Sequence, residues 1–150
     1  MEDAVKVSDS AKRLEEWIHF HILVGFDHLY IYDNSERNVT DLRNVVDKFD
    51  KNHVTYHQWP CHLCNNNRPA HNNPGERSSQ YAAEASCRER YGPQTEWMSF
   101  LDTDEYLVPM KANNKGEYNW NTVLNDMDDQ NMSILMFRSS RGKPRVNLME

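Results

Sequence analysis

The pattern of hydrophobic and polar positions predicts helices and strands in alternation. Five side chains recur at the i, i+3, i+4, i+7 and i+8 spacing of a half-buried helix that begins near Ala11: Leu14, Trp17, Ile18, His21 and Ile22. Gly25 is a suitable C-terminal stop for this helix. His28–Tyr32 is rich in β-formers and predicts a strand, and the short run Val5–Val7 predicts the remnant of an earlier strand.

The same pattern continues to the end of the chain. A helix is expected from about Thr40 or Asp41, then a strand over Val54–Trp59 and a helix from Glu76 to about Tyr91. Three further elements are expected: a strand running from Trp97 into Asp102, a helix from Trp120 to Asp128 and a strand over Ile134–Phe137. Strands that alternate with helices predict an α/β fold with a mostly parallel sheet and helices on both faces.

Length and charge narrow the class of protein. The 150 residues suit a single domain, 1–150, with a polar insertion loop over 61–75. A net charge of −6 without a long basic run argues against a nucleic-acid partner. No apolar stretch approaches the ~18–20 residues of a membrane span and no signal peptide is visible, so the chain as given is expected to be soluble.

Three cysteines, an odd number, do not form a disulfide framework. Cys61 and Cys64 form a C-x-x-C with His57, His62 and His71 nearby, which is suitable ligand chemistry for zinc. A surface loop with incidental cysteines is the alternative, and the polar surroundings of this single motif favour it.

The strongest chemical signal is the run Trp97–Pro109, where an apolar segment ends in the carboxylates of Asp102, Asp104 and Glu105. A ligand of an α/β sheet lies beyond the carboxyl ends of its strands. Crowded carboxylates repel one another, and a divalent cation that also carries substrate phosphates relieves that repulsion. Asp102 and Asp104 are therefore candidates for a metal–nucleotide site, with an ordinary capped turn as the alternative.

Two long blocks, Leu14–Ser35 and Trp97–Pro109, resemble glycosyltransferase family 92, and Gln80–Gly92 falls where that family carries the preceding helix. The resemblance implies a Rossmann-like GT-A glycosyltransferase sandwich. It also implies a nucleotide-sugar donor such as a UDP-sugar, a divalent metal such as Mn²⁺, and a glycan or glycoprotein acceptor. By position, Asp33 and Asp102 would bind the nucleotide-sugar, and Asp104 would coordinate the metal together with Asp102.

The resemblance leaves several points open. The sugar, with galactose as one candidate, and the catalytic base are not identified, and the acidic residues Glu117, Asp126, Asp128 and Asp129 fit surface charges better than a base. Ser8-Asp9-Ser10 stands where the family usually has a Lys-Asn/Asp-Glu triplet. The alternatives are a non-catalytic GT-A-like binding module and another nucleotide-dependent transferase. We expect a chain that is incomplete at both ends, and a Golgi or other secretory-pathway membrane location through a segment absent here.

Overall fold

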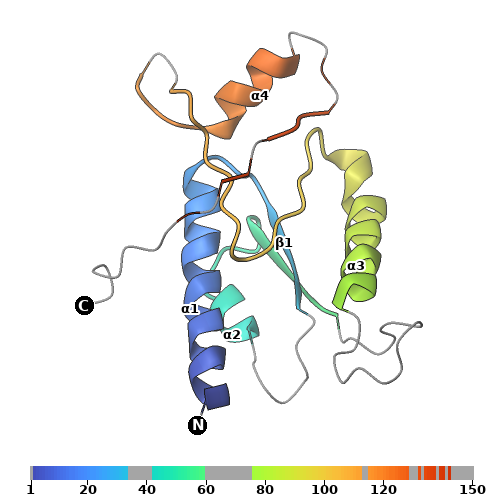
Figure 1. The fold of residues 1–150 in the computed structure, drawn as a ribbon. Coiled ribbons are helices and arrows are strands. Elements are labelled where there is room, and N and C mark those ends of the chain that lie inside the picture. The colour runs from blue at the N-terminus through green and yellow to red at the C-terminus, as the bar shows by residue number, and fades with distance from the viewer. Residues whose placement is uncertain are drawn as a thin grey trace.

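The computed structural model describes residues 2–33, 42–59, 76–112, 115–128, 132, 134–137, 139–140 and 142. Within them the helices and strands follow the order α1 (Glu2–Leu23), β1 (Leu29–Asp33), α2 (Arg43–Val46), β2 (Val54–Gln58), α3 (Glu76–Tyr91), the short 3-10 helix η1 (Gly92–Gln94) and α4 (Trp120–Asp128). Figure 1 shows this path from α1 to α4. The bounds of α3 and α4 agree with the sequence prediction.

The first helix is longer than its hydrophobic periodicity predicts. Val5–Val7 lies inside α1, so the expected strand remnant is wrong. A β-branched residue costs a helix only a few tenths of a kcal/mol, whereas a short strand needs a hydrogen-bonded neighbour. The expected stop is confirmed, because Gly25 has a φ of 96° and its N–H donates to the Ile22 carbonyl at 3.1 Å. The Phe26 N–H donates to the His21 carbonyl at 2.9 Å, which completes a Schellman motif.

The sheet consists of β1 and β2 paired in parallel, among the residues that the structure describes. Leu29 lies opposite Val54, and Asp33 lies opposite Gln58. Parallel neighbours cannot be joined by a tight hairpin, and here the connection between them carries α2. Both strands coincide, within a residue, with strands that the sequence predicts.

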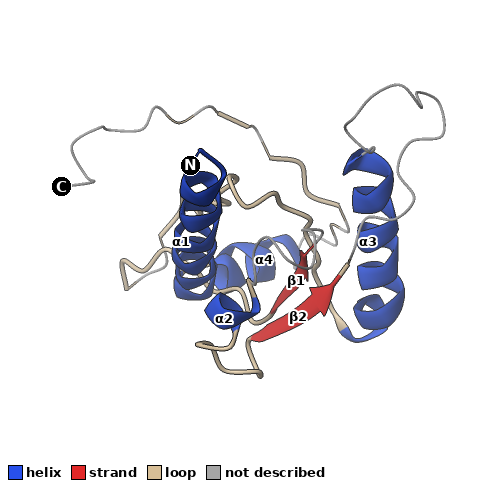
Figure 2. Ribbon diagram, turned by 90° about the horizontal axis from the view of Figure 1, so that it is seen from below, coloured by secondary structure: helices blue, strands red, loops and turns tan. Residues whose placement is uncertain are grey.

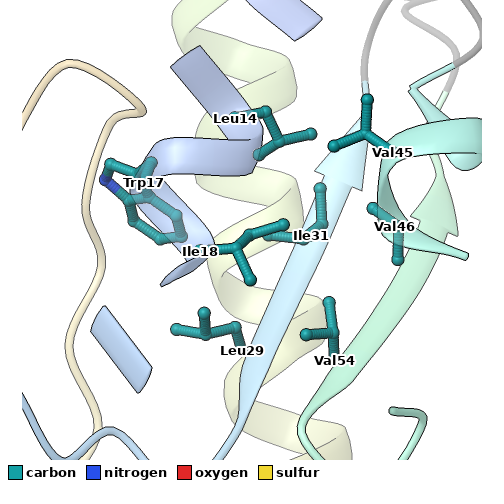
Figure 3. Close-up of a cluster of buried hydrophobic side chains, with 8 residues drawn as sticks. All are labelled: Leu14, Trp17, Ile18, Leu29, Ile31, Val45, Val46 and Val54. Atoms are coloured by element: carbon teal, nitrogen blue, oxygen red, sulfur yellow. The ribbon is translucent and has the colours of Figure 1, made fainter. Parts of the chain in front are cut away.

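One face of this sheet holds the hydrophobic core. Figure 3 shows its eight buried side chains, contributed by α1, β1, α2 and β2: Leu14, Trp17, Ile18, Leu29, Ile31, Val45, Val46 and Val54. Ile18 is fully buried at its centre. Burying one such aliphatic side chain stabilises the folded state by about 1.5–3 kcal/mol, so this cluster determines how α1 and α2 pack on the strands.

The other face of the sheet is aromatic and is covered by α3. The ring of Tyr30 on β1 stacks on that of Tyr91 at a centroid distance of 3.7 Å. The Tyr91 hydroxyl and Nε2 of His57 on β2 share a hydrogen bond of 2.8 Å. Figure 2 shows α3 on one side of the strands and α1 with α2 on the other. The expected parallel sheet with helices on both faces is therefore present for these two strands.

Two predicted strands are not formed. Trp97–Leu101 and Ile134–Phe137 carry no strand in the described residues, although both are rich in β-formers. A strand exists only when a neighbour completes its hydrogen-bond ladder, and local composition cannot show whether that neighbour is there. Leu101 packs against the core nonetheless, so the first of these segments keeps its position beside the sheet.

Residues 61–75, the predicted polar insertion with Cys61 and Cys64, lie outside the described residues. Among those that are described, none of the helices has the length and apolar character needed to cross a membrane.

Candidate functional site

The acidic residues Asp102, Asp104 and Glu105 lie in a hydrogen-bonded turn between η1 and α4. The Glu105 N–H donates to the Asp102 carbonyl at 2.9 Å, and the Asp102 N–H donates to a carboxylate oxygen of Glu105 at 3.2 Å. These reciprocal bonds close a four-residue turn in which Glu105 caps the backbone. Asp102 and Asp104 are exposed, so the turn presents both carboxylates to the solvent.

The turn concentrates negative charge. The pKa of Asp102 is raised, first by partial burial and then by the neighbouring carboxylates of Glu105 and Asp104. Gln80 on α3 donates a long hydrogen bond of 3.4 Å to Asp102 Oδ1, which compensates little of that repulsion. A carboxylate whose pKa is raised in this way favours the binding of a proton or of a cation.

Asp33 lies at the end of β1 in different surroundings. It is 5% exposed, and the Tyr56 hydroxyl on β2 donates to its Oδ2 at 2.7 Å. The Arg43 guanidinium on α2 lies 5.2 Å from the centroid of the Tyr56 ring. The Trp59 N–H donates to the Asp33 carbonyl at 2.7 Å. Asp33 is thus a buried carboxylate that the neighbouring strand holds in place.

The acidic turn does not form a complete metal cage by itself. In the part of the chain that the structure describes, no three His, Cys, Asp or Glu side chains converge as a set of metal ligands. Asp102 and Asp104 nevertheless supply the hard carboxylate oxygens that Mg²⁺ and similar cations prefer, and such sites commonly complete their coordination with water and substrate phosphates. The residues present therefore fit an open site whose remaining ligands come from a bound substrate.

Two of the four downstream acidic residues predicted as surface charges, Asp126 and Glu117, have described side chains. Asp126 on α4 forms an ion pair with Lys111 at 2.8 Å, and Glu117 is exposed. The side chain of Asp128 and all of Asp129 lie outside what is described. Asp126 is consistent with the predicted surface charge.

A shallow pocket of about 300 Å³ opens beside α2 and β2. Arg43 and Tyr56 are among the described residues that line it, and neither Asp33 nor the acidic turn does. One of its lining residues, Tyr56, donates the hydrogen bond to Asp33.

Sequence reasoning missed how the acidic turn is held. Trp17 and His21 were expected only on the buried face of a helix, yet the indole N–H of Trp17 donates to the Glu105 carbonyl at 2.8 Å. The Leu107 N–H lies 3.4 Å from Nε2 of His21. The signal available in the sequence was a tryptophan and a histidine on an apolar helix face, because buried polar ring atoms need hydrogen-bond partners.

Fold and site together define an α/β protein with an acidic turn beside a parallel sheet. The family model for glycosyltransferase family 92 matches residues 5–147. The match covers nearly the whole sequence, and this chain belongs to glycosyltransferase family 92.

Curated relatives agree with this assignment. A glycosyltransferase family 92 protein of Oryza sativa subsp. japonica is 32% identical over 100 residues, which are 66% of this chain and 14% of that protein. One from Ricinus communis is 28% identical over 101 residues, again 66% of this chain and 14% of the relative. The matched region is thus a small part of these relatives. No solved structure matches the chain.

Proposed function

We propose that this chain carries the nucleotide-sugar-binding and metal-binding part of a GT-A glycosyltransferase. The enzyme would transfer a hexose, with galactose as one candidate, from a UDP-sugar to a hydroxyl of a glycan or glycoprotein. The observation that carries the proposal is the pair of exposed carboxylates, Asp102 and Asp104, in the hydrogen-bonded turn Asp102–Glu105 of a chain that belongs to glycosyltransferase family 92. The proposal includes a location at a Golgi or other secretory-pathway membrane.

The donor set of the turn supports a divalent cation, for which we propose Mn²⁺. Asp104 and Asp102 would hold it, because both carboxylates are exposed, whereas that of Glu105 is engaged by the Asp102 N–H. When bound, such a cation acts as a Lewis acid that stabilises the leaving diphosphate. Asp102 would also reach the sugar or ribose of the donor.

Asp33 would contact the nucleoside. Its carboxylate is already oriented by the 2.7 Å hydrogen bond from Tyr56, so little side-chain entropy remains to be lost when a ligand hydroxyl binds. The base that would deprotonate the acceptor hydroxyl is not assigned to any residue of this chain. The role proposed for Asp33, Asp102 and Asp104 is therefore one of donor binding.

Titration calorimetry of UDP into the chain, with and without Mn²⁺, tests the proposal. We expect UDP to bind measurably only when Mn²⁺ is present. Asp104→Ala should abolish that Mn²⁺-dependent binding, because the variant removes a ligand of the cation. Asp27→Ala, which removes an exposed carboxylate outside the turn, is the matched control and should bind as the wild type does.

Retention of Mn²⁺-dependent binding by Asp104→Ala would remove Asp104 from the metal site. Binding of ATP with the same affinity as UDP would instead favour another nucleotide-dependent transferase. A folded wild-type chain that binds neither Mn²⁺ nor UDP would contradict the proposal and favour the non-catalytic module.

A further inference from the structure

The backbone that follows the acidic turn is held by three aromatic side chains. The indole N–H of Trp17 on α1 donates to the Glu105 carbonyl at 2.8 Å. The Leu107 N–H donates to Nε2 of His21, one helical turn further along α1, at 3.4 Å. The indole N–H of Trp120 on α4 donates to the Leu107 carbonyl at 2.9 Å. Two helices thus bind the backbone of Glu105 and Leu107, the residues on either side of Tyr106.

The protonation of His21 follows from its two partners. Its Nδ1 lies 2.8 Å from the Trp17 carbonyl, which can only accept, so Nδ1 carries the proton. Its Nε2 faces the Leu107 N–H, which can only donate, so Nε2 carries none. Burial lowers the pKa of His21 and favours the same neutral form. Both ring nitrogens are therefore engaged, and the ring links the α1 backbone to the chain beyond the turn.

Aromatic packing completes the attachment. The Tyr106 ring stacks on His21 at a centroid distance of 5.9 Å and meets the edge of Phe20 at 5.1 Å. Trp17 and His21 are themselves in contact, with ring centroids 4.2 Å apart. Pro109, two residues beyond Leu107, is fully buried. The chain leaving the turn is consequently fixed at every residue from Glu105 to Leu107.

We propose that Trp17, His21 and Trp120 are positioning residues that set the geometry of the acidic turn for its cation. This inference rests on the proposed function. Glu105 takes part both in the attachment to α1 and in the hydrogen bonds of the turn. Its carbonyl accepts from Trp17, while its N–H donates to the Asp102 carbonyl and its carboxylate accepts from the Asp102 N–H. Fixing the Glu105 backbone therefore fixes the separation at which Asp102 and Asp104 meet a cation. The order of a metal site depends on such supporting bonds behind its ligands.

The test measures the affinity for UDP with and without Mn²⁺ in Trp17→Phe, His21→Phe and Trp120→Phe. Each substitution keeps an aromatic ring and removes the hydrogen bond. We expect the dissociation constant for UDP in the presence of Mn²⁺ to rise about three- to tenfold, the effect of one hydrogen bond. Without Mn²⁺ we expect no measurable UDP binding, in these variants as in the wild type. His21→Gln, whose amide has both a donor and an acceptor, should restore part of the affinity.

Controls separate positioning from a general loss of packing. Trp97→Phe makes the same change at a half-buried tryptophan outside the three bonds and should keep the wild-type affinity. All titrations are made at a temperature where thermal unfolding shows every variant to be folded. The ¹⁵N chemical shifts of the His21 ring should show a protonated Nδ1 and a bare Nε2 in the wild type.

Each outcome decides between the two proposals. If Asp104→Ala loses binding while the three ring variants keep it, the positioning role is wrong and the metal site stands. An equal loss of affinity in Trp97→Phe would also overturn the positioning role. A folded wild type without Mn²⁺-dependent binding would contradict the proposed function and this inference with it.

Discussion

Asp33 and Asp102 both follow an apolar segment, yet the structure gives their carboxylates opposite surroundings. Asp33 ends a formed strand, is 5% exposed and accepts a 2.7 Å hydrogen bond from Tyr56. Asp102 follows a segment that is not a strand, and its side chain is exposed. Its pKa is raised by the partial burial that remains and by the carboxylates of Glu105 and Asp104. The Asp33 carboxylate accepts a hydrogen bond from the neighbouring strand, whereas the Asp102 carboxylate lies beside other carboxylates.

The difference shows that an apolar run followed by aspartate does not define a role. The partner of Asp33 is supplied by the adjacent parallel strand, which brings Tyr56 within reach of the end of β1. The neighbours of Asp102 are acidic residues in its own turn. A buried, hydrogen-bonded carboxylate contributes to the fold, and a crowded, exposed one gains most from a cation.

The largest expected effect is a difference in the free energy of unfolding between variants at the buried and the exposed carboxylate. Asp33→Ala leaves the Tyr56 hydroxyl without its acceptor and should lower the free energy of unfolding by about 1–3 kcal/mol. Asp104→Ala, at an exposed position of the turn, should change it by less than about 0.5 kcal/mol. Urea unfolding followed by circular dichroism measures both. Equal losses in the two variants would remove the distinction drawn between them.

A smaller effect is expected from the partner of Asp33. Tyr56→Phe keeps the ring beneath Arg43 and removes only the hydroxyl, so we expect a loss of about 1 kcal/mol in the free energy of unfolding. A double-mutant cycle of Tyr56→Phe with Asp33→Ala should give a coupling energy of about 0.5–3 kcal/mol. Strict additivity of the two substitutions would show that the hydrogen bond contributes nothing to stability.

The smallest effect is a dependence on pH at the acidic turn. Because the pKa of Asp102 is raised in the folded state, the folded state holds this proton more tightly than the unfolded state does. That stabilisation is complete below the unfolded pKa of about 4 and is lost as the pH rises through the folded pKa. The free energy of unfolding of the wild type should therefore fall, relative to that of Asp102→Asn, as the pH is raised from about 3 to about 6.

Adding Mn²⁺ at about pH 6, the upper end of this pH range, tests whether a cation relieves the loss of stability. A cation bound at the turn should recover the stability lost by ionisation in the wild type, and should do so less in Asp102→Asn. A difference between the two proteins that stays constant across this pH range would show that the pKa of Asp102 is not raised in the folded state.

The sequence predicts those parts of the molecule that local periodicity determines. Glu76–Tyr91 and Trp120–Asp128 are helices with the expected bounds, and Gly25 ends α1 as expected. Their signals are hydrophobic spacing and a terminating glycine or proline, which act within a few residues. The resemblance to a family predicts the class of protein, and the family match confirms it. The exposure of the Asp102 and Asp104 carboxylates is known only from the structure.

The remaining features depend on contacts between distant residues. The segment Trp97–Leu101 has the composition of a strand but is not hydrogen-bonded as one among the described residues. The bond from Trp17 to Glu105 spans 88 residues, and the bond from Leu107 to His21 spans 86. Periodicity places Trp17 and His21 on the buried face of a helix, but it does not say which backbone atoms their rings meet.

Thermal unfolding of the chain with Mn²⁺ and UDP, each alone and together, tests the central claim most directly. A ligand at a hundredfold excess over its dissociation constant stabilises the folded state by about 2.7 kcal/mol, which raises Tm by about 5–10 °C for a chain of this size. We expect Tm to rise by this amount when Mn²⁺ and UDP are present together, in the wild type and in Asp27→Ala. We expect no such rise in Asp104→Ala. A folded wild type whose Tm does not respond, or an equal shift in Asp104→Ala, would contradict the central claim.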